Sequence, residues 1–434
     1  MIGRFNRRRF LVGASLAAGA AAVPTVIPAR AWAGGANERL NIAAIGVGGQ
    51  GGANIAGVRS ENLVAFCDVD ANNLGATAKD FPDTRRFADF RRMYDNVGHS
   101  LDAVVVSTPD HTHAPAAVAA MQLGKHCYCE KPLSHNVAEA RRMTVVAEET
   151  GVVTQLGTQI HAGDNYRRVV ELVRAGAIGP VGEVHAWCPA SYSGGDRPAD
   201  QPPVPEHLDW DLWLGPAPFR PYHPNYVPFR WRGWWDFANG GTGDFFCHYA
   251  DVAYWALDLA HPVRVSADGP PRHPESTPPS LSARLDYPAR GSMPPVVLRW
   301  YDGPGNKPPQ LAEWGVPDWN AGVLLRGEKG MLLTDYGRHV LLPEAQYADF
   351  ERPPHTIPES IGHHREWIEA CKNGEQTTCH FGYSGPLTEG ALLATVAYRV
   401  GTVLEWDAAA LAAPNAPEAE EFLSRTYREG WTLG

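Results

Sequence analysis

Short apolar segments alternate with longer amphipathic segments between residues 40 and 157. The apolar segments predict buried strands, and the amphipathic segments predict helices with one face toward a core. Strands are predicted at residues 40–45, 63–67, 102–107, 125–129 and 152–156. Helices are predicted at residues 52–58, 71–79, 87–94, 114–123 and 138–150. This alternation is typical of an α/β domain built on a parallel sheet.

The first predicted strand runs into a glycine-rich turn with Gly46, Gly48 and Gly51, and Asp68 ends the second strand. Strand, G-x-G-x-x-G turn, helix, strand and acidic residue form the pattern of a dinucleotide-binding fold. Gly46 permits the tight turn, Gly48 admits the pyrophosphate and Gly51 allows close helix packing. A carboxylate at Asp68 would bind the ribose hydroxyls and disfavour a 2′-phosphate, so NAD is predicted over NADP. Gly49 and Gln50 complete the candidate cofactor residues of this turn.

Polar residues follow the next two strands at the carboxyl edge of the predicted sheet, where ligands bind in such folds. Thr108, Pro109 and His113 follow one strand, and Glu130 and Lys131 follow the other; all five are candidate cofactor-binding residues. A lysine beside a nicotinamide can hold a substrate hydroxyl and lower its proton affinity. The alternative is that Lys131 is a solvated loop residue and His113 a surface polar residue.

The remainder of the chain predicts a second domain that opens near residue 158. Residues 165–175 show helical periodicity, and residues 181–187 form a strand-like apolar run. Polar and apolar positions alternate at residues 281–287 and 296–301, which is typical of half-buried antiparallel strands. Further strands are predicted at residues 322–326, 330–335 and 339–342, and helices at residues 361–371 and 387–404.

Residues 193–229 are rich in proline and in aromatic side chains. Aromatic rings beside a cleft can stack on the C–H faces of sugars, but they can equally pack a long loop that lacks regular structure. Trp234 and Trp235 are the aromatic candidates for substrate contact, and His161 is a further candidate.

A glycine-rich run, residues 240–251, leads into a predicted helix that carries Asp244, His248 and Asp251 at spacings of four and three. These positions share one face of a helix. A carboxylate one turn before an imidazole can orient the ring and tune its proton affinity, as in a general base. The alternative is a buried Asp–His pair that caps the helix.

Taken in order, these motifs resemble those of the Gfo/Idh/MocA oxidoreductase family, over nearly the whole chain after the N-terminal segment. The resemblance implies a Rossmann domain followed by an α+β domain with an open, mostly antiparallel sheet, covered by helices on one face and often used for oligomerisation. It implies NAD(P) chemistry on sugars or polyols. By matched position, Lys131 and Asp244 would be catalytic with His248 as the general base, whereas Asp251 would support the helix. Phe246 stands where relatives often carry a small residue, so we expect altered packing there.

The N-terminal 33 residues are predicted to be a signal peptide. Residues 6–11, Asn-Arg-Arg-Arg-Phe-Leu, resemble a twin-arginine export motif, and Ala31-Trp32-Ala33 offers a cleavage site. An uncleaved membrane anchor is the alternative, although the apolar stretch is short for a span. The predicted domains are therefore residues 1–33, 34–157 and 158–434. We expect a periplasmic or secreted protein that uses the twin-arginine export machinery and has no stable membrane insertion after cleavage.

Composition narrows the function classes further. The 434 residues carry a formal net charge of −10, and no nucleic-acid signature appears, so a polyanionic partner is not expected. Seven cysteines show no disulfide framework and no second pair at zinc spacing, so free, mostly buried thiols and no metal site are predicted.

The sequence thus favours an exported, NAD-dependent oxidoreductase that acts on a carbohydrate and retains its cofactor. One alternative is a glycoside hydrolase or lyase that oxidises its substrate transiently. A second alternative is a sugar- or nucleotide-binding protein without activity, which the presence of Lys131, Asp244 and His248 disfavours.

Overall fold

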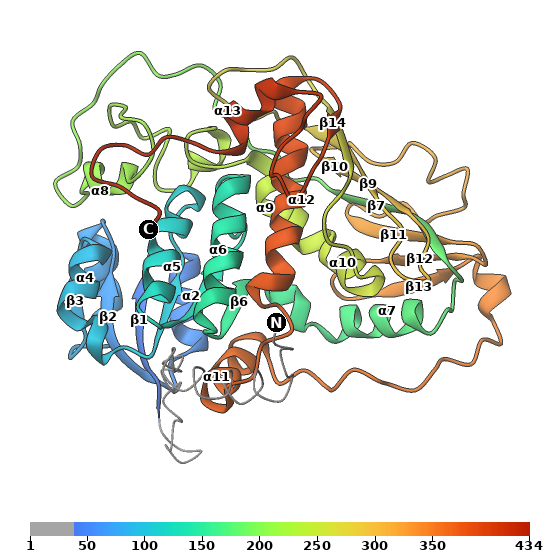
Figure 1. Ribbon diagram of the computed structural model, residues 1–434, viewed down its shortest axis with the longest axis horizontal. Helices are drawn as coiled ribbons and strands as arrows, with labels where there is room; N and C mark the ends of the chain where they lie inside the picture. Colours follow the sequence, from blue (N-terminus) through green and yellow to red (C-terminus); the bar gives the residue numbers. More distant parts are fainter. Residues whose placement is uncertain (1–38) are drawn as a thin grey trace, which may run out of the picture. The chain divides into compact units, whose positions relative to one another are not determined.

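A computed structural model describes residues 39–434, and the predicted signal peptide lies outside this range. The first sheet is parallel, and its strands have the order β3-β2-β1-β4-β5-β6 (Figure 1). Its strands are β1 (Asn41–Ile45), β2 (Asn62–Cys67), β3 (Arg85–Phe87), β4 (Ala103–Val106), β5 (His126–Glu130) and β6 (Thr154–Gly157). Successive residues of β1 enter two different hydrophobic clusters, so both faces of the sheet are buried. The predicted Rossmann-type domain is confirmed.

The helices that connect these strands also follow the predicted pattern. They are α2 (Gln50–Gly57), α3 (Ala71–Thr77), α4 (Phe90–Val97), α5 (His113–Gln122) and α6 (Val137–Thr150). One prediction was wrong in detail, because residues 85–87 pair with β2 as a strand and the helix begins only at Phe90. The Asp89 side chain accepts a hydrogen bond from the Arg91 amide and so fixes that start.

The second sheet is mostly antiparallel and has the order β13-β12-β11-β7-β10-β9-β8-β14, with β7 and β10 as its parallel pair. Its strands are β7 (Val181–Cys188), β8 (Arg264–Asp268), β9 (Leu281–Tyr287), β10 (Val296–Asp302), β11 (Gly322–Gly327), β12 (Met331–Thr334), β13 (His339–Leu342) and β14 (Leu404–Glu405). Alternation places Val323 and Leu325 in the main core, whereas Leu324 packs with Leu311 and Val316 on the other face. The predicted fold class is confirmed, although β8 and β14 were not predicted.

The remaining helices follow β6 in the chain, and the longest of them contacts strands of both sheets. They are α7 (Asp164–Arg174), α8 (Trp210–Leu214), α9 (Gly240–Tyr249), α10 (Asp251–Leu257), α11 (His363–Asn373), α12 (Phe381–Val400) and α13 (Glu420–Leu423). In Figure 1, α12 lies beside α6 and α9, which it contacts, and α11 contacts α2. The last long helices therefore return to the parallel-sheet domain.

The single helix predicted from Gly240 onward is two helices, because α9 ends at Tyr249 and α10 begins at Asp251. All seven cysteines are free and buried, which confirms that prediction. Among residues 39–434, no helix combines the length and apolar character that a membrane crossing needs.

A buried ion pair fastens α12 to α6. The Arg141 guanidinium donates to both carboxylate oxygens of Glu389, at 2.8 and 2.9 Å, and Glu389 is 1% exposed. Because removal of Glu389 would leave Arg141 with an uncompensated charge, we expect Glu389→Ala to lower the free energy of unfolding by about 3 kcal/mol.

Denaturant unfolding measures this effect, with Glu149→Ala as the control on α6, the helix that carries Arg141. Glu149 pairs with Arg142 at 3.4 Å but is 59% exposed, so its loss should cost less than about 1 kcal/mol. Equal losses in the two variants would contradict the assigned role of Glu389.

Candidate active site

The glycine turn between β1 and α2 is closed on its inner side and open on its outer side. A Cβ on Gly51 would lie 1.9 Å from the Gly46 carbonyl oxygen, and Gly46 itself has a φ of +77°. Gly49, with a φ of +51°, has no atom within 4 Å of a built Cβ. The turn therefore presents backbone to open space at the start of a helix, as a pyrophosphate requires.

The Asp68 carboxylate fixes this turn from the neighbouring strand. Its oxygens accept hydrogen bonds from the amides of Val47 and Asp70, both at 2.9 Å, and from the Asn73 side chain at 3.3 Å. Burial raises the pKa of Asp68. The carboxylate stands where a Rossmann fold binds the adenosine ribose, so these residues fit a dinucleotide.

Glu130 at the end of β5 is buried and collects amide donors. Asn54 and Gln159 each donate to its Oε1 at 2.9 Å, and Gln50 lies 3.4 Å from the same atom. Burial raises the pKa of Glu130. This network ties the glycine turn to the strand end that carries Lys131.

His113 joins two loops at the carboxyl edge of the parallel sheet. Its Nδ1 lies 2.8 Å from the Pro132 carbonyl oxygen and its Nε2 lies 2.7 Å from that of Thr108. The ring is 1% exposed. Both ring nitrogens thus face backbone carbonyl groups, and neither is free to bind a ligand. The structure therefore gives His113 a supporting role beside Thr108 and Pro109.

Lys131 and Asp244 form a close ion pair between β5 and α9. The Lys131 ammonium contacts Asp244 Oδ1 and also donates to the Asp244 carbonyl oxygen at 3.1 Å. Burial opposes both charges, but the surrounding charges and hydrogen bonds together outweigh it. The pKa of Lys131 is raised, and Lys131 with Arg232 lowers the pKa of Asp244 to about 2. Both side chains are therefore charged at neutral pH.

Two further residues that the sequence did not single out complete the Asp244 environment. The Tyr192 hydroxyl donates to Asp244 Oδ2 at 2.8 Å, and Arg232 Nε lies 3.3 Å from the same oxygen. The Arg232 guanidinium is flanked by the Trp231 and Phe229 rings, at 4.1 and 4.7 Å. Arg232 stands close before the glycine-rich run, which was a usable signal, whereas Tyr192 lies 52 residues away in a loop.

His248 is oriented by Thr158 and not by Asp244, which corrects the expectation from helix spacing. Its Nδ1 lies 3.1 Å from Thr158 Oγ1, and that hydroxyl donates to the Cys247 carbonyl oxygen at 3.3 Å. Because the Thr158 hydroxyl donates its one proton to the Cys247 carbonyl oxygen, it can only accept a hydrogen bond from His248 Nδ1–H. The lone pair then resides on Nε2, which has no hydrogen-bond partner within residues 39–434. Burial, aided by the charge of Lys131, lowers the pKa of His248 to about 3, so the ring is neutral.

The third polar residue of this segment, Asp251, belongs to a separate buried cluster. Both of its oxygens lie 3.0 Å from His161 Nδ1, and Tyr383 donates to Oδ1 at 2.7 Å. The His161 ring stacks on Trp255 with centroids 4.1 Å apart. Cys379 lies within 4.8 Å of these ligand atoms, a grouping that the sequence did not indicate. The structure thus makes Asp251 a support of α10 and places His161 in the core.

Trp234 and Trp235 are also core residues. They are 1% and 5% exposed, and their indole N–H groups donate to the carbonyl oxygens of Asn225 and His273. Trp234 packs with Tyr226 and other aromatic residues of the 193–229 loop. The loop-packing interpretation therefore describes Trp234, and neither indole N–H is free for a ligand.

Asp110 adds a carboxyl group beside the Lys131–Asp244 pair. It is 4% exposed, and burial raises its pKa to about 8, although Arg232 and Lys131 oppose this shift. At neutral pH the group is therefore mostly protonated and can donate a hydrogen bond.

The parallel sheet, the glycine cradle and the buried Lys–Asp–His group define a Rossmann-fold oxidoreductase with a second α/β domain. The chain belongs to the Gfo/Idh/MocA family. A model described as "Oxidoreductase family, NAD-binding Rossmann fold" matches residues 40–158. A second, "Oxidoreductase family, C-terminal alpha/beta domain", matches residues 181–290, so that the two cover more than half of the chain. The predicted family and its NAD-binding domain are confirmed.

Two curated relatives are similar over part of their lengths. An inositol 2-dehydrogenase of Rubrobacter xylanophilus is 30% identical over 176 residues, which span 39% of this chain and 47% of that protein. A glycosyl hydrolase family 109 protein of Shewanella pealeana is 26% identical over 152 residues, 33% of each chain. The matched region thus spans less than half of either relative.

Among solved structures, the WlbA dehydrogenase from Bordetella pertussis, in complex with NADH and UDP-GlcNAcA, shares the fold. It superposes with a TM-score of 0.60 at 17% identity and covers 85% of this chain and 99% of its own.

The Thr158 hydroxyl should control which nitrogen of His248 carries the proton. In Thr158→Val the acceptor for Nδ1–H is lost, so we expect the Nε2 lone-pair tautomer to lose its dominance. Long-range ¹H–¹⁵N correlation spectra of the histidine rings measure this population directly.

Thr158→Ser retains the hydroxyl and is the matched control, which should keep the wild-type tautomer. Under the general-base role that the family resemblance implies for His248, turnover should fall about tenfold or more in the valine variant. Identical spectra for the valine and serine variants would contradict this role of Thr158.

Proposed function

We propose that this protein is an NAD-dependent oxidoreductase that acts on a CH–OH group of a sugar or polyol. The observation that carries the proposal is the charged pair of Lys131 and Asp244, together with a neutral His248 on the same helix as Asp244. The inositol dehydrogenase name of a relative supports the substrate class.

Each residue has a distinct task in the proposed reaction. Because Lys131 is positively charged, it donates a hydrogen bond to the substrate oxygen and stabilises the developing alkoxide. Neutral His248 accepts the hydroxyl proton at Nε2. Asp244 holds the Lys131 ammonium in place and remains ionised throughout. Bound NAD supplies the hydride acceptor.

The proposed preference for NAD over NADP rests on Asp68. Its carboxylate occupies the edge of the glycine turn and already receives three donors. A 2′-phosphate there would be repelled by the Asp68 carboxylate, whereas ribose hydroxyls can donate hydrogen bonds to it.

Removal of the Lys131 charge tests the function. In Lys131→Met we expect kcat/KM to fall at least about a hundredfold, because the group that stabilises the alkoxide is lost. A panel of inositols, free sugars and glycosides, assayed through NADH absorbance, measures the rate. NAD affinity should stay within about threefold, since Lys131 is paired to Asp244 and not to the glycine turn.

Lys307→Met is the matched control, because Lys307 pairs with Asp318 on the surface, away from the described site. No turnover in the wild-type protein, with ligand binding unchanged in Lys131→Met and His248→Ala, would favour the binding-protein alternative over an enzyme.

A second candidate function is glycoside cleavage through a transient keto-sugar. The similarity to a glycosyl hydrolase family 109 protein favours it, and the same three residues would serve the oxidation and the return reduction. Glycoside cleavage without net NADH accumulation under anaerobic conditions would select this function over a simple dehydrogenase.

We further propose that the protein is exported in folded form with NAD retained, on the strength of the arginine motif at residues 6–11. Because no NAD pool is at hand outside the cytoplasm, the cofactor would be recycled within the site. Protein isolated from the periplasm should begin near residue 34 and carry about one nucleotide per chain, as measured by mass spectrometry after denaturation.

The matched control replaces Arg7 and Arg8 with lysine, which keeps the charge but removes the paired arginines and should leave the chain in the cytoplasm. Export of the control, or exported protein without nucleotide, would contradict the proposal.

A further inference from the structure

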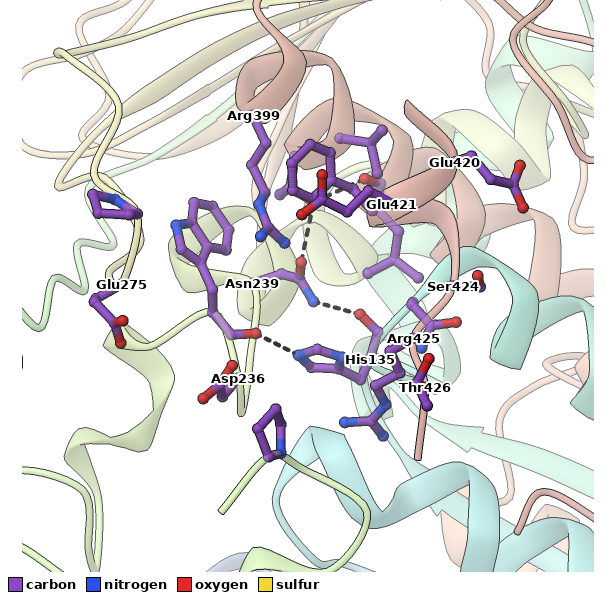
Figure 2. A pocket seen from close by; sticks show the side chains of 18 residues that line it. His135, Asp236, Asn239, Glu275, Arg399, Glu420, Glu421, Ser424, Arg425 and Thr426 are labelled. Carbon is purple, nitrogen blue, oxygen red and sulfur yellow. Dashed lines mark hydrogen bonds between the residues drawn. The ribbon is translucent and has the colours of Figure 1, made fainter. Parts of the chain in front are cut away.

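A pocket of about 500 Å³ lies at the last turns of α12, separate from the residues assigned to catalysis. Its wall combines α12, the segment after α13 and the chain around Trp235 (Figure 2). Lys131, Asp244 and His248 are not among its lining residues.

The floor of the pocket is fixed by hydrogen bonds. His135 Nε2 lies 2.8 Å from the Trp235 carbonyl oxygen, and Asn239 donates to the His135 carbonyl oxygen at 2.8 Å. Thr395 on α12 donates to Asn239 Oδ1 at 3.1 Å. The wall is therefore preorganised, which limits the cost of binding a ligand.

Arg399 and Arg425 are the cations among the lining residues; Arg425 is paired with Glu139, whereas no carboxylate of residues 39–434 lies within ion-pair distance of Arg399. Its guanidinium lies between two aromatic rings, 4.9 Å from that of Trp235 and 4.0 Å from that of Phe422. Within residues 39–434 it has no hydrogen bond and no ion pair. Figure 2 shows it directed from α12 toward the space above Asn239. The rings hold the fork in one orientation and leave its N–H edge available for a bidentate acceptor.

The charge of Arg399 persists although its surroundings disfavour it. Burial lowers the pKa of Arg399 to about 10, so the group is still protonated at neutral pH. A partly desolvated charge without a partner is unfavourable. Glu421 and Asp236 favour the Arg399 charge from a distance, but neither forms an ion pair with it, and Asp236 and Glu275 are paired with Arg220.

The rest of the rim restricts the kind of anion. Glu420 and Glu421 line the pocket and are exposed, and they would repel a dianion more strongly than a monoanion. Ser424 and Thr426 add hydroxyl groups at the same rim. Carboxylates and hydroxyls of this kind accept hydrogen bonds from ligand hydroxyl groups.

We propose that this pocket is a second ligand site that binds a small hydroxylated carboxylate, such as a sugar acid. The ligand carboxylate pairs with the Arg399 guanidinium, and its hydroxyls face Glu420, Glu421 and Ser424. The site is independent of the proposed oxidoreductase chemistry, since it shares no residue with it.

Titration calorimetry of the holoenzyme at low ionic strength tests the proposal with three probes, glucuronate, glucose and inorganic phosphate. We expect glucuronate to bind and glucose to bind at least about tenfold more weakly, because only the acid supplies a partner for Arg399. Phosphate should also bind more weakly than glucuronate, because of the acidic rim.

Three variants locate the binding. Arg399→Gln should weaken glucuronate binding about tenfold or more, whereas Lys131→Met should leave it unchanged, which separates this pocket from the active site. Glu421→Gln removes a repelling charge on an exposed residue and should tighten binding by about two- to threefold. Because Glu421 is exposed, this variant stays informative even if Arg399→Gln folds poorly, which the thermal unfolding midpoint reveals.

Several results would overturn the proposal. If glucuronate binds no more tightly than glucose, the ligand carboxylate does not contribute to binding. If folded Arg399→Gln binds glucuronate as well as the wild-type protein does, the ligand does not bind at Arg399. Loss of binding in Lys131→Met assigns glucuronate to the active site instead. Tighter binding of phosphate than of glucuronate shows that the acidic rim does not select a monoanion.

Discussion

The contact between Lys131 and Asp244 is the constraint on which the described site depends. It joins the end of β5 in the parallel sheet to α9, the helix that begins with the glycine-rich run of the second domain. Both groups are buried, and desolvation of two charges is costly, so the pair contributes geometry more than stability. The two charges can approach each other in the core only if the two sheets keep one fixed relative position. The bidentate Arg141–Glu389 pair connects α12 to α6 and so helps to fix the same relative position of the two sheets.

Local sequence patterns predicted the elements whose physics is local. The glycine turn was predictable because a Cβ on Gly51 would collide with backbone, a constraint that any chain of this conformation must obey. Lys131 was predictable because it follows a buried strand at the edge where ligands bind. The short strands β3, β8 and β14 were not predicted, because their few residues show little alternation of polar and apolar side chains.

Local sequence patterns could not predict contacts between segments that are far apart in the chain. Helical spacing suggested that Asp244 orients His248, yet two residues on one helix face can each turn to a partner on another element. Asp244 binds Lys131, and His248 lies against Thr158, 90 residues earlier in the chain. Tyr192 reaches Asp244 from a loop whose sequence carries no indication of it. Likewise, aromatic content alone could not separate a sugar platform from a packed loop, because both need the same side chains.

The charge states around Asp244 explain how the site can favour an oxyanion. His248 is neutral because burial and the nearby Lys131 both disfavour its protonated form. Asp110 is mostly protonated because burial disfavours its charge. Lys131 and Arg232 are the cations beside the Asp244 carboxylate, and Glu130 adjoins Lys131 in the chain. A developing alkoxide beside Lys131 would be stabilised by the ammonium group. In the proposed reaction His248 takes the hydroxyl proton at Nε2, but burial and Lys131 disfavour the resulting cation. The proton must therefore pass onward from Nε2, the ring nitrogen that does not contact Thr158.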